Sequence, residues 1–139
     1  MAYTREGRVI EPEIRPCINK SGGALGKGVL VKLSATPTQP FEVDHAAAVT
    51  DIPYGVTMEA SAADGDIVNV QIRGVAPVYP AAAGIPVVGA NITSDASGHA
   101  LTAGNNEKVW GVVVGLAASA TDWVEVELAG PCGGSPTHA

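Results

Sequence analysis

The sequence has few aromatic residues and no long helical pattern. Its 139 residues include two tryptophans, three tyrosines and one phenylalanine. A hydrophobic core must therefore be built mainly from valine, isoleucine, leucine and alanine. No stretch repeats apolar residues at helical spacing over three turns, and 17 glycines and 10 prolines interrupt the chain, which long helices do not tolerate. These absences argue against a helical domain and favour short strands joined by turns.

Basic charge and long apolar runs are also scarce. Eight lysines and arginines stand against 14 aspartates and glutamates, which gives a net charge of −6. A nucleic-acid-binding protein needs a basic stripe to displace phosphate counterions, and this sequence has none. The longest apolar run, residues 109–120, is shorter than the roughly 20 residues that a membrane-spanning helix needs, and the polar opening of the chain is unlike a signal peptide. We therefore expect no nucleic-acid partner, no membrane partner and synthesis in the cytoplasm.

Groups that could carry catalysis or bind metal are isolated in the sequence. The two cysteines, Cys17 and Cys132, have no ligand-spaced partners, and in a reducing cytoplasm we expect both to be free thiols. Asp95 is the only carboxylate in the turn-rich segment 91–104, whereas calcium needs several oxygen ligands. No nucleophile is placed with a base and an oxyanion donor. We expect no catalytic residue, no cofactor and no metal.

The chain contains an internal repeat with an offset of 56 residues. Residues 54–74, YGVTMEASAADGDIVNVQIRG, align without a gap to residues 110–130, WGVVVGLAASATDWVEVELAG. Gly55 then corresponds to Gly111, and Gly74 to Gly130 (111 − 55 = 130 − 74 = 56). The same offset relates residues 28–31 to residues 84–87. Two copies are too few for a solenoid, so we interpret the chain as one internally duplicated domain.

Each copy ends in a run that alternates with a period of two. Such alternation predicts a half-buried strand with one face on the core. We expect Gln71 and Glu127 on the solvent faces, and the residues predicted to point inward are Val68, Val70 and Ile72 in the first run and Val124, Val126 and Leu128 in the second. The apolar runs 54–60 and 109–116 precede short turn-prone segments, so each is predicted to pair with the following strand as an antiparallel hairpin. The expected fold is all-β: one compact β-barrel-like or β-sandwich domain.

The first 16 residues differ from the rest of the chain. They contain three of the four arginines, Arg5, Arg8 and Arg15, interleaved with three glutamates. Because Pro12 and Pro16 favour extended conformations in the residues before them, residues 1–16 are predicted to form an extended N-terminal arm. We assign residues 17–130 to the duplicated β domain and residues 131–139 to a flexible C-terminal tail.

The order of the motifs is similar to that of a known family. It runs from Gly74-Val-Ala-Pro-Val through Ala82-Ala-Gly-Ile-Pro-Val and Ile92-Thr-Ser-Asp-Ala-Ser-Gly to Val124-Glu-Val-x-Leu. Residues 22–130 thereby resemble the capsid decoration, or cement, proteins of tailed bacteriophages. The resemblance implies a β-barrel-like body that assembles as homotrimers on the outside of the virion capsid. It also implies an N-terminal arm that reaches over the major capsid protein.

This resemblance suggests which residues make contacts. Arginines are enriched at protein interfaces, so we expect the arm to bind the capsid through its arginines and apolar residues: Arg5, Arg8, Val9, Ile10, Ile14 and Arg15. The sparse aromatic rings are the candidates for an oligomer interface. Tyr54 and Trp110 occupy matching positions in the repeat, and Trp123 lies on the strand face opposite Val124. If these roles hold, the protein is made in the host cytoplasm and located in the virion.

A second class of function also fits a small, acidic, duplicated β domain. Barrel-sandwich carrier domains, such as lipoyl domains of enzyme complexes, share these properties. Their modified lysine lies at the tip of a hairpin, whereas the predicted tips here, residues 61–65 and 119–121, contain no lysine. A small hydrolase has only the isolated histidines His45 and His99 to support it. We therefore favour a non-enzymatic capsid decoration protein and keep the carrier domain as the alternative.

Overall fold

The computed structural model describes residues 3–5, 8–10, 12–82, 84–116 and 123–131, with side chains from residue 12 onward. These residues form strands and contain no helix, so none of them crosses a membrane as a helical span. The strands are β1 (Tyr3–Arg5), β2 (Arg8–Ile10), β3 (Glu13–Asn19), β4 (Leu30–Leu33), β5 (Glu42–His45), β6 (Gly55–Thr57), β7 (Ile67–Val78), β8 (Asn91–Ser94), β9 (Ala100–Thr102), β10 (Gly111–Leu116) and β11 (Val124–Leu128). The predicted all-β class is confirmed.

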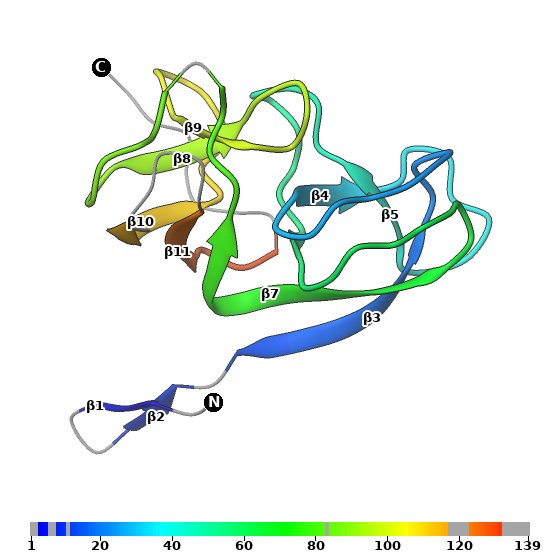
Figure 1. Ribbon diagram of the computed structural model, residues 1–139, viewed down its shortest axis with the longest axis horizontal. Coiled ribbons are helices and arrows are strands. Elements are labelled where there is room, and N and C mark those ends of the chain that lie inside the picture. The colour runs from blue at the N-terminus through cyan, green and yellow to red at the C-terminus, as the bar shows by residue number, and fades with distance from the viewer. Residues whose placement is uncertain (1–2, 6–7, 11, 83, 117–122, 132–139) are drawn as a thin grey trace.

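Five strands close into a barrel. The nine-stranded sheet has the order β3-β5-β4-β6-β7-β11-β10-β8-β9, and an additional pairing of β3 with β7 closes its first five strands. Strand β3 pairs in parallel with β5 and antiparallel with β7. β7 is long enough to serve both parts of the sheet, because its first half pairs with β3 and β6 and its second half with β11. Figure 1 shows β7 running along the barrel and bending toward β11 and β10.

Both predicted hairpins are present, and their registers are the same. In the first, Val56 lies opposite Gln71; in the second, Val112 lies opposite Glu127. Each pair is related to the other by the 56-residue offset of the repeat (112 − 56 = 127 − 71 = 56). The repeat in sequence is therefore a repeat of strand pairing.

The duplication extends beyond the hairpins, although not at the expected positions. The order β5-β4-β6-β7 is mirrored by β9-β8-β10-β11, so β8 takes the place of β4. The predicted match of residues 84–87 to residues 28–31 is wrong as a structural equivalence, since 84–87 form no strand. Val31 pairs with Gly55, whereas Ile92 pairs with Gly111, so the offset at this strand is 61 (92 − 31 = 61) rather than 56. Pro86 lies within residues 84–87. Because proline has no backbone N–H to donate to a neighbouring strand, it disfavours a strand there.

The predicted inward residues lie in the core. Val68, Val70, Ile72, Val124 and Val126 are almost fully buried, and Leu128 packs partly buried against the core. One core cluster lies inside the barrel around Val31, Val43 and Val70. A second lies between the barrel and strands β8 to β11, and includes Leu30, Val78, Ile92 and Trp110. The period-two pattern thus correctly predicted which side chains of β7 and β11 face the core.

Gln71 is the exception to the predicted faces. It was expected in solvent, but it is only 2% exposed. Its Nε2 donates hydrogen bonds to the carbonyl oxygens of Arg73 (2.9 Å) and Val75 (3.0 Å). These two residues flank Gly74, which has a φ of 89° that favours glycine. The buried amide of Gln71 is therefore hydrogen-bonded to carbonyl groups at the point where β7 bends, as buried polar groups generally are.

Candidate interaction surface

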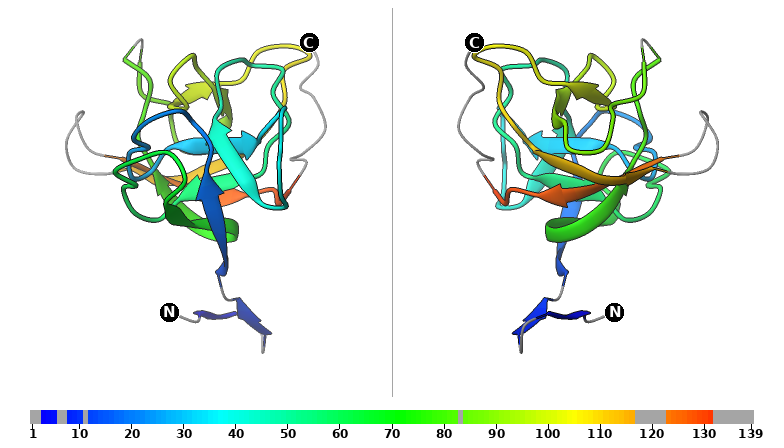
Figure 2. Two further views of the ribbon diagram at one scale, coloured as in Figure 1. Left: turned by 90° about the vertical axis from the view of Figure 1, so that its right-hand side faces the viewer. Right: turned by 90° about the vertical axis from the view of Figure 1, so that its left-hand side faces the viewer.

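The N-terminal segment forms a hairpin outside the barrel. Strands β1 and β2 make a two-stranded antiparallel sheet of their own, separate from the nine-stranded sheet. Figures 1 and 2 show this hairpin projecting from the barrel beyond the start of β3. Arg5 lies opposite Arg8, and Val9 opposite Thr4, in the register of the pair. The four predicted contact residues Arg5, Arg8, Val9 and Ile10 are thus brought together in one projecting element.

The remaining two predicted arm residues belong to the barrel. Strand β3 begins at Glu13, and Ile14 and Arg15 pair with Gln71 and Val70 of β7. The arm expected to extend through Pro16 is therefore corrected in two respects. Its outer part is a hairpin, and residues 13–16 are the first half of a barrel strand. Ile14 remains 47% exposed at the base of the hairpin.

Arg15 contacts three groups, two of which come from distant parts of the chain. Its Nη1 donates a hydrogen bond to the Tyr54 hydroxyl at 3.0 Å, and its Nη2 lies 3.3 Å from Glu13 Oε2. Its guanidinium carbon stands 5.2 Å from the centroid of the Phe41 ring, within the range of a cation–π contact. The hydrogen bond to Tyr54 raises the pKa of Arg15 above its ordinary value, so Arg15 is a fixed positive charge.

Charges of both signs lie at the base of the hairpin. Glu13 accepts contacts from two arginines, because Arg73 Nε lies 3.3 Å from its second carboxylate oxygen. All three side chains are substantially exposed, so each pair contributes little to folding stability. The arrangement presents a row of alternating charges, Arg15, Glu13 and Arg73, next to the projecting hairpin. Such a row suits a partner surface of mixed charge.

The aromatic rings predicted for an oligomer interface do not lie on one surface. Tyr54 is 7% and Trp110 2% exposed, because both pack into the chain's own core, and this corrects their assignment as contact residues. Trp123 is 38% exposed. Its Nε1 donates to Glu125 Oε1 at 3.0 Å, and its ring meets the Tyr79 ring edge to face at a centroid distance of 6.4 Å. Of the three, only Trp123 keeps substantial exposed surface.

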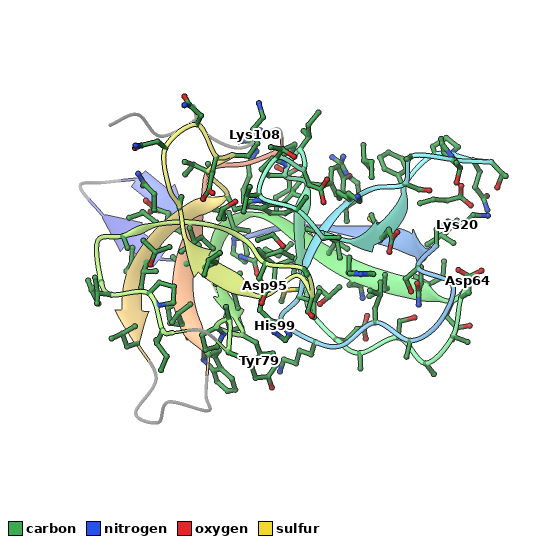
Figure 3. The ribbon with its side chains drawn as sticks, turned by 90° about the horizontal axis from the view of Figure 1, so that it is seen from above. Lys20, Asp64, Tyr79, Asp95, His99 and Lys108 are labelled. Carbon is green, nitrogen blue, oxygen red and sulfur yellow. The ribbon has the colours of Figure 1, made fainter. Side chains whose placement is uncertain are left out.

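The surface around Trp123 brings together residues that the sequence alone did not connect. Tyr79 also contacts His99 edge to face, with ring centroids 6.5 Å apart, and Figure 3 shows Asp95, His99 and Tyr79 following one another from the middle of the view toward its lower edge. Asp95 Oδ1 accepts hydrogen bonds from the backbone amides of Ser97 and His99, each at 2.8 Å. The carboxylate therefore holds a tight turn. Across the described part of the chain, no three His, Cys, Asp or Glu side chains are grouped to hold a metal ion.

Comparison with known proteins identifies the chain's relatives. A family model described as phage cement protein matches residues 17–128. The chain belongs to the phage cement protein family. The match begins within β3, beyond the projecting hairpin, and covers strands β4 to β11. Membership supports a capsid-associated, structural role for this cement protein, as the resemblance implied.

A solved structure shares the fold of this cement protein. It is described as the crystal structure of head fiber gp8.5 N base in bacteriophage phi29. The two chains are 22% identical, the TM-score is 0.63, and the match covers 87% of this chain and 98% of the other. At this identity the likeness concerns the fold. Among curated proteins, none matches this chain.

Proposed function

We propose that this cement protein binds the outer surface of a phage head, contacts the major capsid protein through its N-terminal hairpin, and stabilises the capsid lattice as a homotrimer. Family membership supports the capsid as the partner. The observation that carries the proposal is the hairpin β1–β2, which has its own sheet and projects from a closed barrel. A two-stranded hairpin alone is at best marginally stable in water. A partner surface would add contacts that stabilise such a hairpin.

The composition of the hairpin favours a protein partner of mixed charge. Arg5 and Arg8 provide donors for bidentate pairs with carboxylates, and Val9 and Ile10 provide apolar contact. The row of Arg15, Glu13 and Arg73 continues this pattern onto the barrel. Ordering the hairpin on a partner costs about 1–2 kcal/mol per residue in backbone entropy, so only a sizeable interface offsets that cost. A neighbouring protein of the head lattice offers such an interface.

Deletion of residues 2–10 tests the role of the hairpin. The deletion stops short of Glu13, because residues 13–16 pair with β7 and their removal would damage the barrel. We expect the truncated protein to melt at the wild-type temperature and to lose binding to phage heads prepared without the protein, measured by co-sedimentation. A truncated protein that decorates heads at unchanged occupancy would place the contact on the barrel instead.

Charge reversal provides a finer test with a matched control. Arg5→Glu with Arg8→Glu should weaken binding to heads, most strongly at low salt, because screening reduces charge attraction between exposed groups. Lys27→Glu with Lys108→Glu changes the net charge equally on the barrel and should leave binding close to wild type. Equal loss in both double variants would show that only net charge matters.

The oligomeric state and the stabilising effect need separate measurements. A homotrimer predicts a sedimentation mass of three subunits, free or on the head, and a mass of one subunit in both states would refute it. A stabilising role predicts that decorated heads release their DNA at a higher temperature than bare heads. If decorated and bare heads release their DNA at the same temperature, the protein binds the head without stabilising it.

A further inference from the structure

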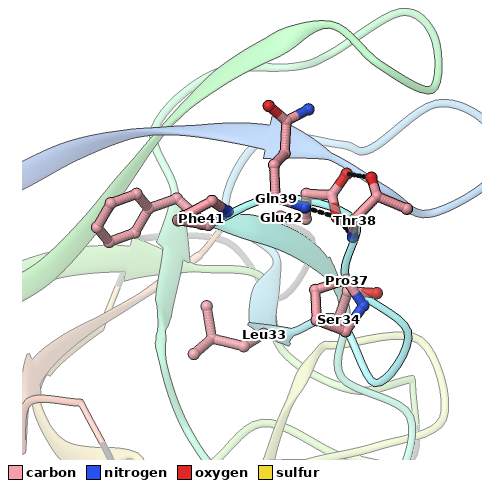
Figure 4. Close-up of a pocket in the computed structure, with 8 residues that line it drawn as sticks. Leu33, Ser34, Pro37, Thr38, Gln39, Phe41 and Glu42 are labelled. Atoms are coloured by element: carbon pink, nitrogen blue, oxygen red, sulfur yellow. Dashed lines mark hydrogen bonds between the residues drawn. The ribbon is translucent and has the colours of Figure 1, made fainter.

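An apolar surface lies beside the base of the N-terminal hairpin. Three large apolar side chains stand in solvent there: Leu33 (50% exposed), Phe41 (46%) and Ile52 (60%). Leu33 separates two depressions, one lined by the loop 34–41 and the other by residues 50–54. Figure 4 shows Leu33, Pro37 and Phe41 around the first of them. We call the surface formed by these two depressions with Leu33, Phe41 and Ile52 the apolar groove.

Phe41 has a backbone conformation that its side chain does not favour. Its φ is 64°, in the left-handed region, where a bulky residue is strained. It is also the only phenylalanine of the chain, and almost half of it stays in solvent. The fold of the chain alone does not require an exposed ring at this point, since glycine would fit the backbone better. Backbone strain of this kind clusters at active sites, ligand clamps and switch regions.

The loop that carries Phe41 is held in place before any partner arrives. Glu42 is 3% exposed, and its carboxylate accepts hydrogen bonds from Thr38 N (2.5 Å), Thr38 Oγ1 (3.0 Å) and Gln39 N (3.2 Å). The prolines Pro37 and Pro40 further restrict the loop. A preorganised surface loses little conformational entropy on binding, so the groove is suited to contact.

Most charged side chains around the apolar groove are paired within the chain. Lys20 Nζ lies 3.8 Å from Glu42, and Lys32 Nζ lies 3.2 Å from Asp51. Arg15, which stacks on Phe41, is paired with Glu13. A strongly charged segment would find few unpaired opposite charges here. The groove therefore favours an uncharged, apolar occupant.

The groove is continuous with the element to which we assign capsid attachment. Arg15 contacts Phe41 in one depression and the hydroxyl of Tyr54 in the other, and β3 leads from Arg15 back to the hairpin. A partner held by the hairpin is thus brought to the groove. We propose that the groove binds an extended, uncharged apolar segment of the same capsid protein that the hairpin contacts. This inference rests on the proposed function.

A pair of serine substitutions with a matched control tests the groove. Leu33→Ser with Ile52→Ser removes two of its exposed side chains. Leu116→Ser with Ile67→Ser removes a leucine and an isoleucine of nearly equal exposure, 49% and 65%, outside the groove. We expect the groove variant to bind heads at least about tenfold more weakly than wild type, and the control variant to bind normally. Thermal melts of both should stay close to wild type.

Phe41→Gly gives an independent test, because it relieves backbone strain while it removes the ring. The variant should melt at or above the wild-type temperature and still bind heads several-fold more weakly. A loss of stability without a loss of binding would make Phe41 a structural residue and overturn its assignment to the groove.

The outcomes separate this inference from the proposed function. If the wild-type protein does not bind heads, both fail. If it binds and the groove variants bind equally well, only the groove assignment is overturned. If the groove variants instead change the sedimentation mass of the free protein, the occupant of the groove is a second copy of this chain.

Discussion

Adding one methyl group at the repeated glycines should destabilise the protein strongly. Gly55 and Gly111 occupy the same position in the two hairpins. A β-carbon on Gly55 would lie 2.5 Å from both the carbonyl oxygen of Gln71 and Val70 Cγ1. A β-carbon on Gly111 would collide with the equivalent carbonyl oxygen, that of Glu127. Backbone oxygens in a paired strand cannot move aside as a flexible side chain can.

The size of the effect follows from this geometry. Overpacking of a well-packed core costs typically ~1–3 kcal/mol, and in a chain of this length each kcal/mol lowers Tm by roughly 3–5 °C. We therefore expect Gly55→Ala and Gly111→Ala each to lower Tm by roughly 3–15 °C, as measured by circular dichroism and checked by urea unfolding.

Gly115→Ala is the control in the same strand as Gly111. A β-carbon there would meet only Glu125 Cβ at 3.6 Å and Cγ at 3.7 Å, which is ordinary contact. Replacing glycine by alanine at a compatible position reduces the entropy of the unfolded chain, so this variant should be as stable as wild type or slightly more stable. Equal stability of all three variants would refute the close approach of the strands and the shared register of the hairpins.

Two further predictions concern titratable groups. Hydrogen bonds from the Thr38 and Gln39 amides hold the pKa of Glu42 below its ordinary value of 4.5. The folded state therefore binds fewer protons than the unfolded state, and the free energy of unfolding should fall as pH drops through about 4.5 and below. Glu42→Gln should flatten this part of the pH–stability profile. An unchanged profile in the variant would assign the acid sensitivity to other carboxyl groups. Burial raises the pKa of the Cys17 thiol, so in a Cys132→Ser background iodoacetamide should label Cys17 far more slowly in the folded than in the urea-unfolded protein at neutral pH. Equal labelling rates would show that the thiol is accessible.

Local pattern in the sequence was sufficient to predict the strands of the repeat and their pairing. Period two in residues 67–72 and 124–128 reports which side chains face the core, because successive side chains of a strand alternate in direction. The paired residues of the two hairpins are related by the 56-residue offset of the sequence repeat, so the repeat predicted that the second hairpin would share the register of the first. The resemblance to cement proteins rests on the same short-range motifs, and the family match confirms it.

The candidate contact residues were predictable only in part. The concentration of arginine in the first 16 residues indicated a distinct segment, and Arg5 and Arg8 are paired backbone positions of the projecting hairpin. Phe41 had no periodic pattern around it that would mark it as exposed. Tyr54 and Trp110 had matching positions in the repeat, but a matching position does not reveal whether a ring faces inward or outward.

Tertiary structure alone decided how the barrel closes and which residues surround Arg15 and Gln71. Closure depends on β3 pairing with β5 and β7, across separations that no local pattern encodes. Arg15 reaches Tyr54 from 39 residues away, and Gln71 is buried because the chain bends at Gly74. Local sequence determines which side chains alternate along a strand, whereas burial of a polar group or exposure of an aromatic ring depends on which distant strands arrive beside it.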